Sequence, residues 1–168
     1  MTGAQEVVVE RASFRHIDSV IELRALLLED STQSYACTSP QERMLWRTAY
    51  GKWLSETLHS SLDVCLLVAV KGHQVVGCVT GFIDRRAPGP DCLNGWCGWV
   101  QSMVVAPPLR GQGISRALMQ SLMKWFEARD VGKVVLQSTP SAEHLYEGLG
   151  YCRSSEPVLT WQVREHCA

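Results

Sequence analysis

The part of the sequence that decides the fold is Met103-Val104-Val105-Ala106-Pro107-Pro108-Leu109-Arg110-Gly111-Gln112-Gly113-Ile114-Ser115. Its apolar, β-branched start predicts a buried strand, its prolines and glycines predict a turn, and its end opens the apolar stripe of a helix. A helix N-terminus presents unpaired backbone N–H groups and a partial positive charge, which the two glycines leave open to a ligand. The stretch therefore predicts a phosphate-binding cradle at the start of a helix.

The surroundings of this cradle are more basic than the rest of the chain. The 168 residues carry a formal net charge of −1, which excludes a general polyanion-binding role. From residue 107 to residue 133, however, basic residues outnumber the acidic Glu127 and Asp130; they are Arg110, Arg116, Lys124, Arg129 and Lys133. This local excess fits an anion site, although a solvated helix face would show the same pattern.

Hydrophobic periodicity predicts a series of strands and helices on both sides of this stretch. Polar or Pro/Gly-rich segments at 30–40 and 85–95 predict loops. The order predicts one mixed α/β domain with antiparallel strands in front and a crossover βαβ unit behind. The predicted strands are 7–14, 63–70, 74–83, 96–105, 133–137 and 157–163, and the predicted helices are 17–29, a helix around 45–53, 114–129 and 142–149.

The cysteines are scattered and show no metal-ligand spacing. No C-x-x-C pair occurs, and Cys92 and Cys97 have no second ligand pair beside them, so we expect neither a zinc site nor a disulfide framework. This usage, the absence of a signal-peptide pattern and the absence of a membrane-length apolar run predict a soluble cytoplasmic protein. The cysteines are Cys37, Cys65, Cys78, Cys92, Cys97, Cys152 and Cys167.

Two common phosphate-binding signatures do not fit the cradle. The dinucleotide fingerprint needs a third glycine where this chain has Arg116, and the P-loop pattern is absent. The string Arg110–Ser115 instead resembles the [QR]-x-x-G-x-[GA] signature of the GNAT superfamily of acyl-CoA-dependent N-acetyltransferases, with a serine at the last position.

Two flanking stretches strengthen this resemblance. Val104–Pro107 is similar to the V-x-P strand end of the family, and Leu145–Tyr151 is similar to its L-Y-E-x-L-G-[FY] element, with the predicted strand 133–137 between them. The resemblance implies a single GNAT-like domain over residues 1–168. It also implies a mixed, mostly antiparallel central sheet of about six to seven strands, flanked by helices and containing a splayed parallel pair.

The resemblance implies acetyl-CoA as the co-substrate. Backbone N–H groups from Arg110 to Ser115 would hold its diphosphate, and the strand edge at Met103 and Val105 would pair with its amide-bearing arm. Thr139 stands where family members often carry an asparagine that contacts the coenzyme. The implied cofactor-binding residues are Met103, Val104, Val105, Arg110, Gly111, Gln112, Gly113, Ile114, Ser115, Thr139 and Tyr146.

Tyr146 is the implied catalytic residue, a general acid that protonates the departing thiolate. The general base stays open, because Trp99–Met103 contains no acid where family members often carry a glutamate. His144 is expected to point away from Tyr146 on a regular helix. The remaining candidates are a water oriented by Gln101 or Ser102 and the carboxylates of Glu29, Asp30, Asp84 and Glu143.

Aromatic residues predict the acceptor pocket, built by the segment that joins the first two helices and by the chain after Tyr151. Such a pocket suits an apolar or cationic acceptor, although tryptophans in the core would give the same pattern. The residues concerned are Tyr35, Trp46, Tyr50 and Trp53, with Trp96, Trp99 and Trp161 on the same side if alternation holds.

We therefore expect direct acetyl transfer to a primary amine of a small molecule, amino acid or peptide. One alternative is a non-catalytic acyl-CoA-binding module, which the missing strand glutamate favours. Another is an acetyltransferase that modifies proteins or aminoacyl-tRNA, but the near-neutral chain has no basic stripe for nucleic acid. No membrane partner is expected, and a homodimer, common among related proteins, stays open.

Overall fold

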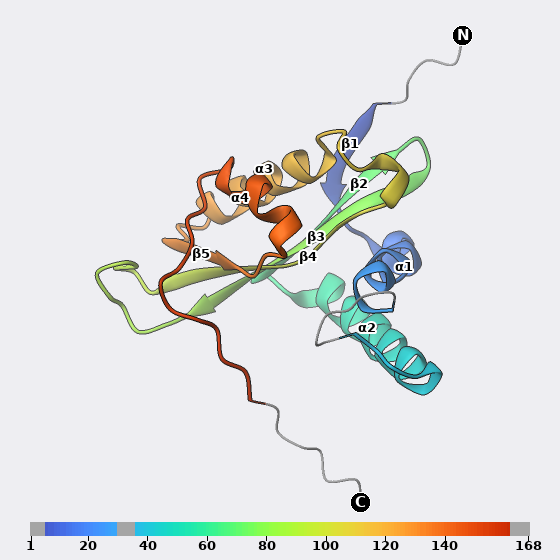
Figure 1. Ribbon diagram of the computed structural model, residues 1–168, viewed down its shortest axis with the longest axis horizontal. Helices are drawn as coiled ribbons and strands as arrows, with labels where there is room; N and C mark the ends of the chain where they lie inside the picture. The colour runs from blue at the N-terminus through green and yellow to red at the C-terminus, as the bar shows by residue number, and fades with distance from the viewer. Residues whose placement is uncertain (1–5, 30–35, 162–168) are drawn as a thin grey trace, which may run out of the picture.

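A central sheet organises the computed structural model, which describes residues 6–29 and 36–161 (Figure 1). The strands follow one another in the spatial order β1-β2-β3-β4-β5. The pairs from β1 to β4 are antiparallel, and β4 and β5 are parallel. The strands are β1 (Val7–Arg11), β2 (Val64–Lys71), β3 (Gln74–Arg85), β4 (Trp96–Val105) and β5 (Lys133–Leu136).

Helices cover both faces of this sheet, which confirms the predicted mixed α/β layers. In Figure 1, α3 (Ile114–Glu127) and α4 (Glu143–Glu147) lie above the sheet, whereas α1 (Ile17–Leu28) and α2 (Pro40–Ser60) lie below it. Three single turns of 3₁₀ helix complete the regular structure, at Phe14–His16, Pro107–Leu109 and Pro140–Ala142. No helix of the described chain is long and apolar enough to span a membrane.

Each face of the sheet has its own hydrophobic core. The apolar stripe of α3 packs on the upper face, and its buried members are Ile114, Leu118, Met119, Leu122 and Phe126. The lower core joins α1 and α2 to the sheet through Val20, Leu23, Leu54, Val68, Cys78 and Val104. Because successive residues of a strand point to opposite faces, the same strands supply both cores.

The parallel pair opens toward the cradle, as the family resemblance implied. β5 pairs with β4 only from Cys97 to Val100, while β4 continues to Val105. On the other side of β4, Gln101 pairs with Thr80 and Val104 pairs with Cys78, so the extra residue at Ser102 forms a β-bulge with a φ of 52°. The bulge and the short β5 leave the edge of β4 at 101–105 unpaired by a strand.

The predicted strand at 157–163 is wrong over its described part. Residues 157–161 form no strand, and Val158, Leu159 and Trp161 are 57%, 88% and 86% exposed. No strand lies beside them and they bury little apolar surface, so the β-branched pattern alone does not produce pairing. Residues 162–163 lie outside the described residues. The described sheet therefore has five strands rather than about six to seven.

The cysteines follow the prediction in part. Cys65 and Cys78 are buried in the core, as expected from their apolar neighbours. Cys92 and Cys97 are also buried, and the fold brings their sulfur atoms to 3.7 Å as free thiols that share a hydrogen bond. Their contact depends on the shape of the 86–95 loop, which spacing along the chain does not predict.

Candidate active site

The stretch predicted to form the cradle makes a turn at the N-terminus of α3, which begins at Ile114. Gly111 and Gly113 have φ angles of 76° and 80°, a backbone conformation that costs about 1–2 kcal/mol for other residues. A Cβ atom at either position would meet no atom within 4 Å, so the space in front of this turn is open. The glycines therefore adopt this turn without the cost that other residues would have and keep it accessible.

The helices α2 and α3 differ in how the backbone N–H groups of their first turns are used. At α2, the Ser39 hydroxyl accepts from the backbone N–H of Glu42, and the Glu42 carboxylate accepts from that of Ser39, both at 3.2 Å. At α3, the N-cap is Gly113, with no side-chain cap and no acidic residue in the first turn. The first N–H groups of α3 are therefore left for a ligand, and their field favours an anion.

A cleft of about 640 Å³ lies in front of this helix start. All the residues predicted to bind the coenzyme line this cleft, with the exception of Gln112. Gln112 is exposed and does not belong to the lining. The remaining lining residues were not predicted to bind the coenzyme, although Leu109, Arg116 and Leu145 stand in stretches that the sequence singled out. These remaining residues are Leu27, Leu109, Arg116, Ser141, Ala142 and Leu145. Leu27 belongs to α1, so the cleft reaches from the cradle across the open edge of β4 to the lower helices.

Two arginines of the cleft are oriented by backbone carbonyls. The Nε atom of Arg110 donates to the carbonyl of Val105 at 3.1 Å, and a terminal nitrogen of Arg116 donates to the carbonyl of Gly148 at 3.2 Å. Neither guanidinium forms an ion pair with a carboxylate in the described part of the chain. Their positive charge thus adds to that of the helix start and favours a phosphate group.

Tyr146 lies at the other end of the same cleft, where its side chain is buried. Its ring meets that of Tyr151 edge-on, with ring centroids 5.9 Å apart. Burial raises the pKa of Tyr146 above its ordinary value of 10, so the phenol keeps its proton at neutral pH. The residue also faces a neighbouring hollow of about 850 Å³ between β5 and the chain after Tyr151. Its position allows it to donate a hydrogen bond at the end of the cleft.

The described acidic candidates for a general base are already engaged. The hydrogen bond from Arg47 lowers the pKa of Glu29, which weakens that carboxylate as a base. His144 is exposed and points away from Tyr146, as expected. Asp30 lies outside the described residues. The ion pairs are Glu29 with Arg47, Asp84 with Arg86 and Glu143 with Arg153.

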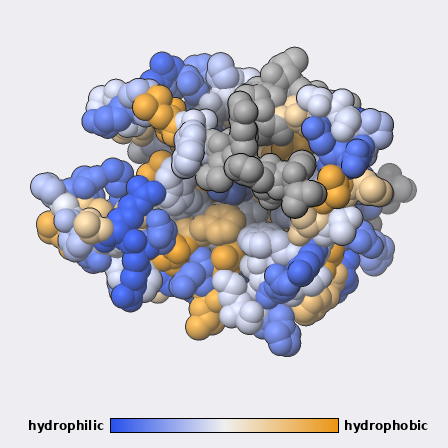
Figure 2. Space-filling view, turned by 90° about the horizontal axis from the view of Figure 1, so that it is seen from below, coloured by the Kyte–Doolittle hydropathy of each residue, from blue (hydrophilic) through white to orange (hydrophobic). Residues whose placement is uncertain are grey.

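An aromatic pocket of about 390 Å³ lies under the sheet between α1 and α2. The predicted Trp46, Tyr50 and Trp53 meet there, and the rings of Tyr50 and Trp53 stack with centroids 5.7 Å apart. Gln101 also lines the pocket, although the sequence analysis expected it near the reacting groups. The other lining residues were not predicted for this pocket; they are Arg24, Leu28, Ala49 and Phe82. Figure 2 shows the molecule from below, where hydrophobic residues occupy a hollow with hydrophilic residues around it.

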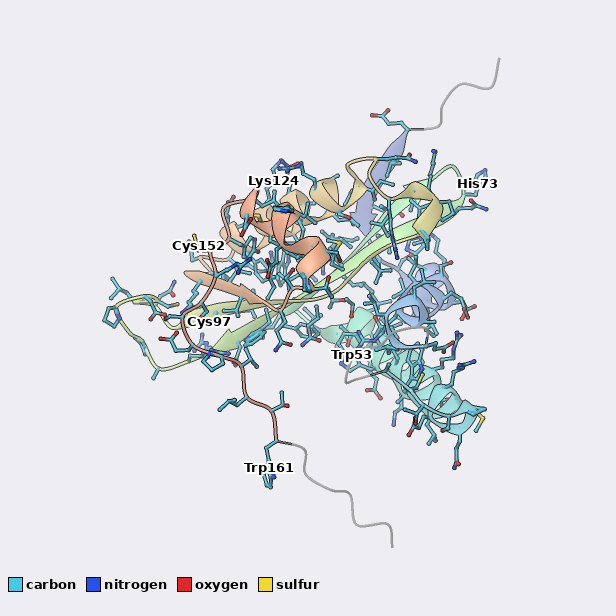
Figure 3. The ribbon with its side chains drawn as sticks, in the orientation of Figure 1. Trp53, His73, Cys97, Lys124, Cys152 and Trp161 are labelled. Carbon is cyan, nitrogen blue, oxygen red and sulfur yellow. The ribbon has the colours of Figure 1, made fainter. Side chains whose placement is uncertain are left out.

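The other predicted aromatic residues do not join this pocket. Trp96 lies against Arg85, Trp99 lies against Arg86, and Trp161 is exposed at the end of the described chain, far from Trp53 (Figure 3). The chain after Tyr151 lines the hollow beside Tyr146 instead. This expectation was wrong, because alternation along β4 places Trp96 and Trp99, three residues apart, on opposite faces of the sheet, and it does not predict the position of a residue along a face. Tyr35 lies outside the described residues.

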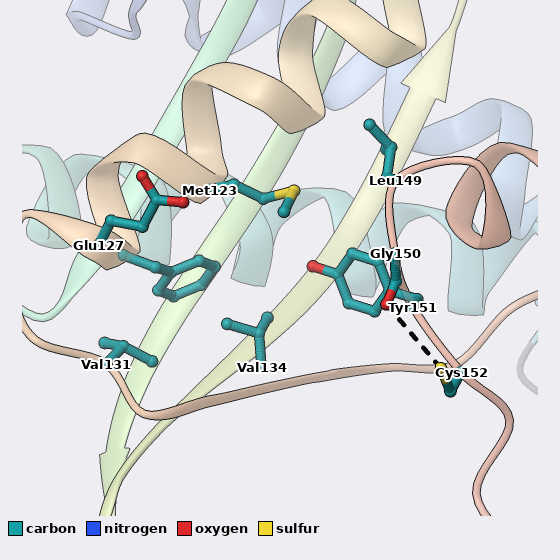
Figure 4. A pocket seen from close by; sticks show the side chains of 9 residues that line it. Met123, Glu127, Val131, Val134, Leu149, Gly150, Tyr151 and Cys152 are labelled. Carbon is teal, nitrogen blue, oxygen red and sulfur yellow. Dashed lines mark hydrogen bonds between the residues drawn. The ribbon is translucent and has the colours of Figure 1, made fainter.

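One further hollow, of about 330 Å³, lies between α3 and the chain from Leu149 to Cys152 (Figure 4). Met123 and Val134 form its apolar walls, and Glu127 lies at its border. Apart from Cys152, which belongs to the chain after Tyr151, it contains no residue from the parts of the sequence predicted to bind the coenzyme or the acceptor.

A helix start open to an anion, an unpaired strand edge and a buried tyrosine thus lie together in one cleft. The model of the acetyltransferase (GNAT) family matches residues 22–151, which include all three features. The chain belongs to this family.

Sequence and structure comparisons agree with this membership. The glucosamine 6-phosphate N-acetyltransferase of Schizosaccharomyces pombe is 24% identical over 101 residues, covering 60% of this chain and 88% of that protein. A GCN5-related N-acetyltransferase from Ralstonia eutropha superposes with a TM-score of 0.78 at 17% identity, covering 93% of this chain and 99% of the other. A predicted acetyltransferase from Clostridium acetobutylicum, solved with acetyl-CoA, gives a TM-score of 0.75 at 14% identity, covering 96% and 99%. At these identities the two structures establish the shared fold.

Proposed function

We propose that this protein transfers the acetyl group of acetyl-CoA directly to a primary amine of a small molecule, amino acid or peptide. The observation that carries this proposal is a single cleft that joins the open helix start at Gly113, the unpaired edge of β4 and Tyr146. Family membership and the acetyl-CoA in the Clostridium structure support acetyl-CoA as the co-substrate.

The cleft offers a matching group for each part of the coenzyme. Backbone N–H groups from Gly111 to Ser115, with Arg110 and Arg116 beside them, suit the diphosphate. The backbone at Met103 and Val105 suits the amide-bearing arm, which would add to the sheet as a short pseudo-strand. An arm bound along this edge runs between the cradle and Tyr146, so its thiol end would approach the tyrosine.

The transfer needs a neutral amine, a positioned thioester and a proton for the leaving sulfur. The amine nitrogen attacks the thioester carbon, so a C–N bond forms, the C–S bond breaks and the electron pair leaves on the sulfur. Tyr146 donates a proton to this thiolate, whose conjugate thiol has a pKa near 8.5, the amine loses a proton to solvent, and the tyrosinate regains one from solvent. Holding both substrates in line supplies much of the acceleration.

A water oriented by Gln101 is our proposal for the route of the amine proton. The side chain of Gln101 lines the aromatic pocket beside the bulge of β4. The Ser102 hydroxyl accepts a hydrogen bond from Arg24 and is therefore engaged. Because Glu29, Asp84 and Glu143 are all paired with arginines, none of them is a better base.

The competing function is a module that binds acyl-CoA without turnover. It is favoured because the acidic candidates that the structure describes are all paired with arginines. A thiol-release assay with acetyl-CoA and a panel of amines separates the two. The panel holds amino acids, peptide N-termini, aromatic amines and glucosamine 6-phosphate, the compound in the name of the S. pombe relative. Calorimetry with coenzyme A accompanies it.

We expect coenzyme A to bind at micromolar or lower dissociation constant and at least one amine to release thiol. Binding without release from any amine would leave the non-catalytic module. No binding at millimolar coenzyme A would remove both functions. The assay therefore decides between an enzyme and a module and gives the class of the acceptor at once.

A further inference from the structure

The composition of the aromatic pocket narrows the class of acceptor. We propose that the acceptor is a primary amine with an aromatic body that also carries a carboxylate, and that Arg24 binds this carboxylate. The inference rests on the proposed function, because it concerns the acceptor side of the same site.

The pocket and the coenzyme cleft adjoin each other along two shared elements. From α1, Arg24 and Leu28 face the pocket while Leu27 faces the cleft. From β4, Gln101 lines the pocket and Met103 lines the cleft, with the bulge at Ser102 between them. A molecule in the pocket therefore lies next to the strand edge that we assign to the coenzyme arm.

The walls of the pocket suit a flat apolar group. Trp46, Tyr50, Trp53 and Phe82 form a continuous series of ring contacts, with successive centroids 6.3, 5.7 and 5.8 Å apart. Aromatic pairs at such separations gain about 0.5–1.5 kcal/mol beyond their buried area. With a volume of about 390 Å³, the pocket has room for one aromatic side chain and its polar end.

Arg24 gives this aromatic pocket a positive charge. Its guanidinium lies 4.6 Å from the centre of the Tyr50 ring, and one of its nitrogens donates to the Ser102 hydroxyl. Within the described residues it forms no ion pair, whereas the neighbouring Arg43 and Arg47 both reach Glu29. A half-buried arginine is stabilised by a carboxylate that pairs with it, and a bound acceptor would supply one.

Two buried hydroxyls point to a polar ligand group at the same place. The hydroxyls of Tyr50 and Thr80 are buried and meet no partner in good hydrogen-bond geometry, although Arg24 and Thr80 lie close to the Tyr50 hydroxyl and act to lower its pKa. Buried polar groups are usually fully paired. Tyr50 is only 9% exposed and lines the pocket. Burial raises its pKa to about 12, so the phenol stays a neutral donor that a carboxylate can accept from.

The same contacts disfavour a cationic acceptor, which an aromatic pocket would otherwise suit. Arg24 already lies over the Tyr50 ring, and Arg47 lies 5.5 Å from the centre of the Trp46 ring. A second cation on these faces would meet like charges. The aromatic surface is thus shared with the cations of the protein itself, and an anionic substituent is the complementary choice.

Matched pairs of acceptors test the inference: tryptophan against tryptophanamide, and tyrosine against tyrosinamide. Each amide keeps the aromatic body and removes the negative charge. Its amine is also less basic, so a larger fraction of it is neutral near pH 7, and this difference alone would favour the amide over the acid. We expect the wild type to have a kcat/KM at least about tenfold higher for the acid, as one charge-assisted contact allows.

Two variants isolate the guanidinium. Arg24→Gln should lower kcat/KM for the acid about tenfold and leave the amide within about threefold, whereas Arg24→Lys should keep part of the preference. Arg43→Gln is the matched control, because Arg43 pairs with Glu29 on the same pair of helices but does not line the pocket. This control should retain the full preference for the acid.

Equal rates for acid and amide in the wild type, or an unchanged preference in Arg24→Gln, would overturn the inference. Acetylation of other amines but of no aromatic acid would also overturn it and leave the proposed function standing. Failure to bind coenzyme A, or failure to acetylate any amine, would remove the proposed function and this inference together. Coenzyme calorimetry on each variant shows whether the cleft itself is intact.

Discussion

The coenzyme cleft and the aromatic pocket adjoin each other, yet they are built from different kinds of groups. The cleft draws most of its lining from one continuous stretch, 103–115, with its backbone N–H groups and strand edge, and Leu27, Arg116 and residues between 139 and 146 complete it. The pocket draws on side chains of α1, α2, β3 and β4, from Arg24 to Gln101. A site made of backbone groups therefore follows from a local sequence motif, whereas a site made of side chains depends on how distant elements pack.

Tyr146→Phe tests whether the cleft does chemistry as well as binding. Removing the phenol hydroxyl should lower kcat about 100-fold, in the range of general acid catalysis, and change the dissociation constant of coenzyme A by less than about threefold. Steady-state kinetics measures kcat, and calorimetry measures the dissociation constant of coenzyme A. Tyr151→Phe is the control, since the Tyr151 hydroxyl is buried without a hydrogen-bond partner, and it should keep the wild-type kcat. Equal kcat for Tyr146→Phe and wild type, with chemistry rate-limiting, would contradict the acid role.

Gly113→Ala tests the backbone origin of coenzyme binding. The new methyl group enters the open space before α3 and disfavours the φ of 80°, so the dissociation constant of coenzyme A should rise at least about tenfold. Gly150→Ala is a matched control, because Gly150 also has a positive φ of 92° and open space, but lies outside the cleft. Both variants should lose about 1–2 kcal/mol of stability by urea unfolding. Equal coenzyme affinity in the two variants would argue against the cradle.

Glu29→Gln tests the support of the pocket, since Glu29 joins α1 to Arg47 of α2. The Arg47 hydrogen bond lowers the pKa of Glu29 in the folded protein, so its stabilisation is present above the ordinary value of 4.5 and is lost as the pH falls through the lower folded value. The variant should lose about 1 kcal/mol at pH 7 and progressively less below pH 4.5. Urea unfolding at several pH values measures this, and a pH-independent loss would contradict the ion pair.

Thr80→Val should have the smallest effect and the opposite sign on stability. The Thr80 hydroxyl is buried without a partner, so an isosteric methyl group should raise the free energy of unfolding by about 0.5–1 kcal/mol. If the hydroxyl serves an acceptor in the neighbouring pocket, KM for that acceptor rises at the same time, whereas coenzyme affinity stays constant. Thermal unfolding measures the change in stability, and acceptor kinetics measures the change in KM. A destabilised variant would show that the Thr80 hydroxyl has a structural partner.

The same contrast explains how much the sequence could predict. The strand, turn and helix of 103–115 and the Leu145–Tyr151 element have local signatures, so the sequence could predict residues that line one cleft, with only Gln112 outside the lining. Arg24 gives no such signal, because it stands in the apolar run of α1 and its position over Tyr50 depends on how α1 packs on α2. The bulge at Ser102 is likewise invisible in a run that reads as a regular strand.

The central claim is that the backbone at the start of α3 binds the diphosphate of coenzyme A and directs its thiol toward Tyr146. A crystal structure of the protein with bound coenzyme A tests it directly. We expect the diphosphate within hydrogen-bonding distance of the N–H groups of Gly111 to Ser115, with the arm along β4. A diphosphate bound elsewhere, with the turn before α3 closed by side chains, would contradict the account.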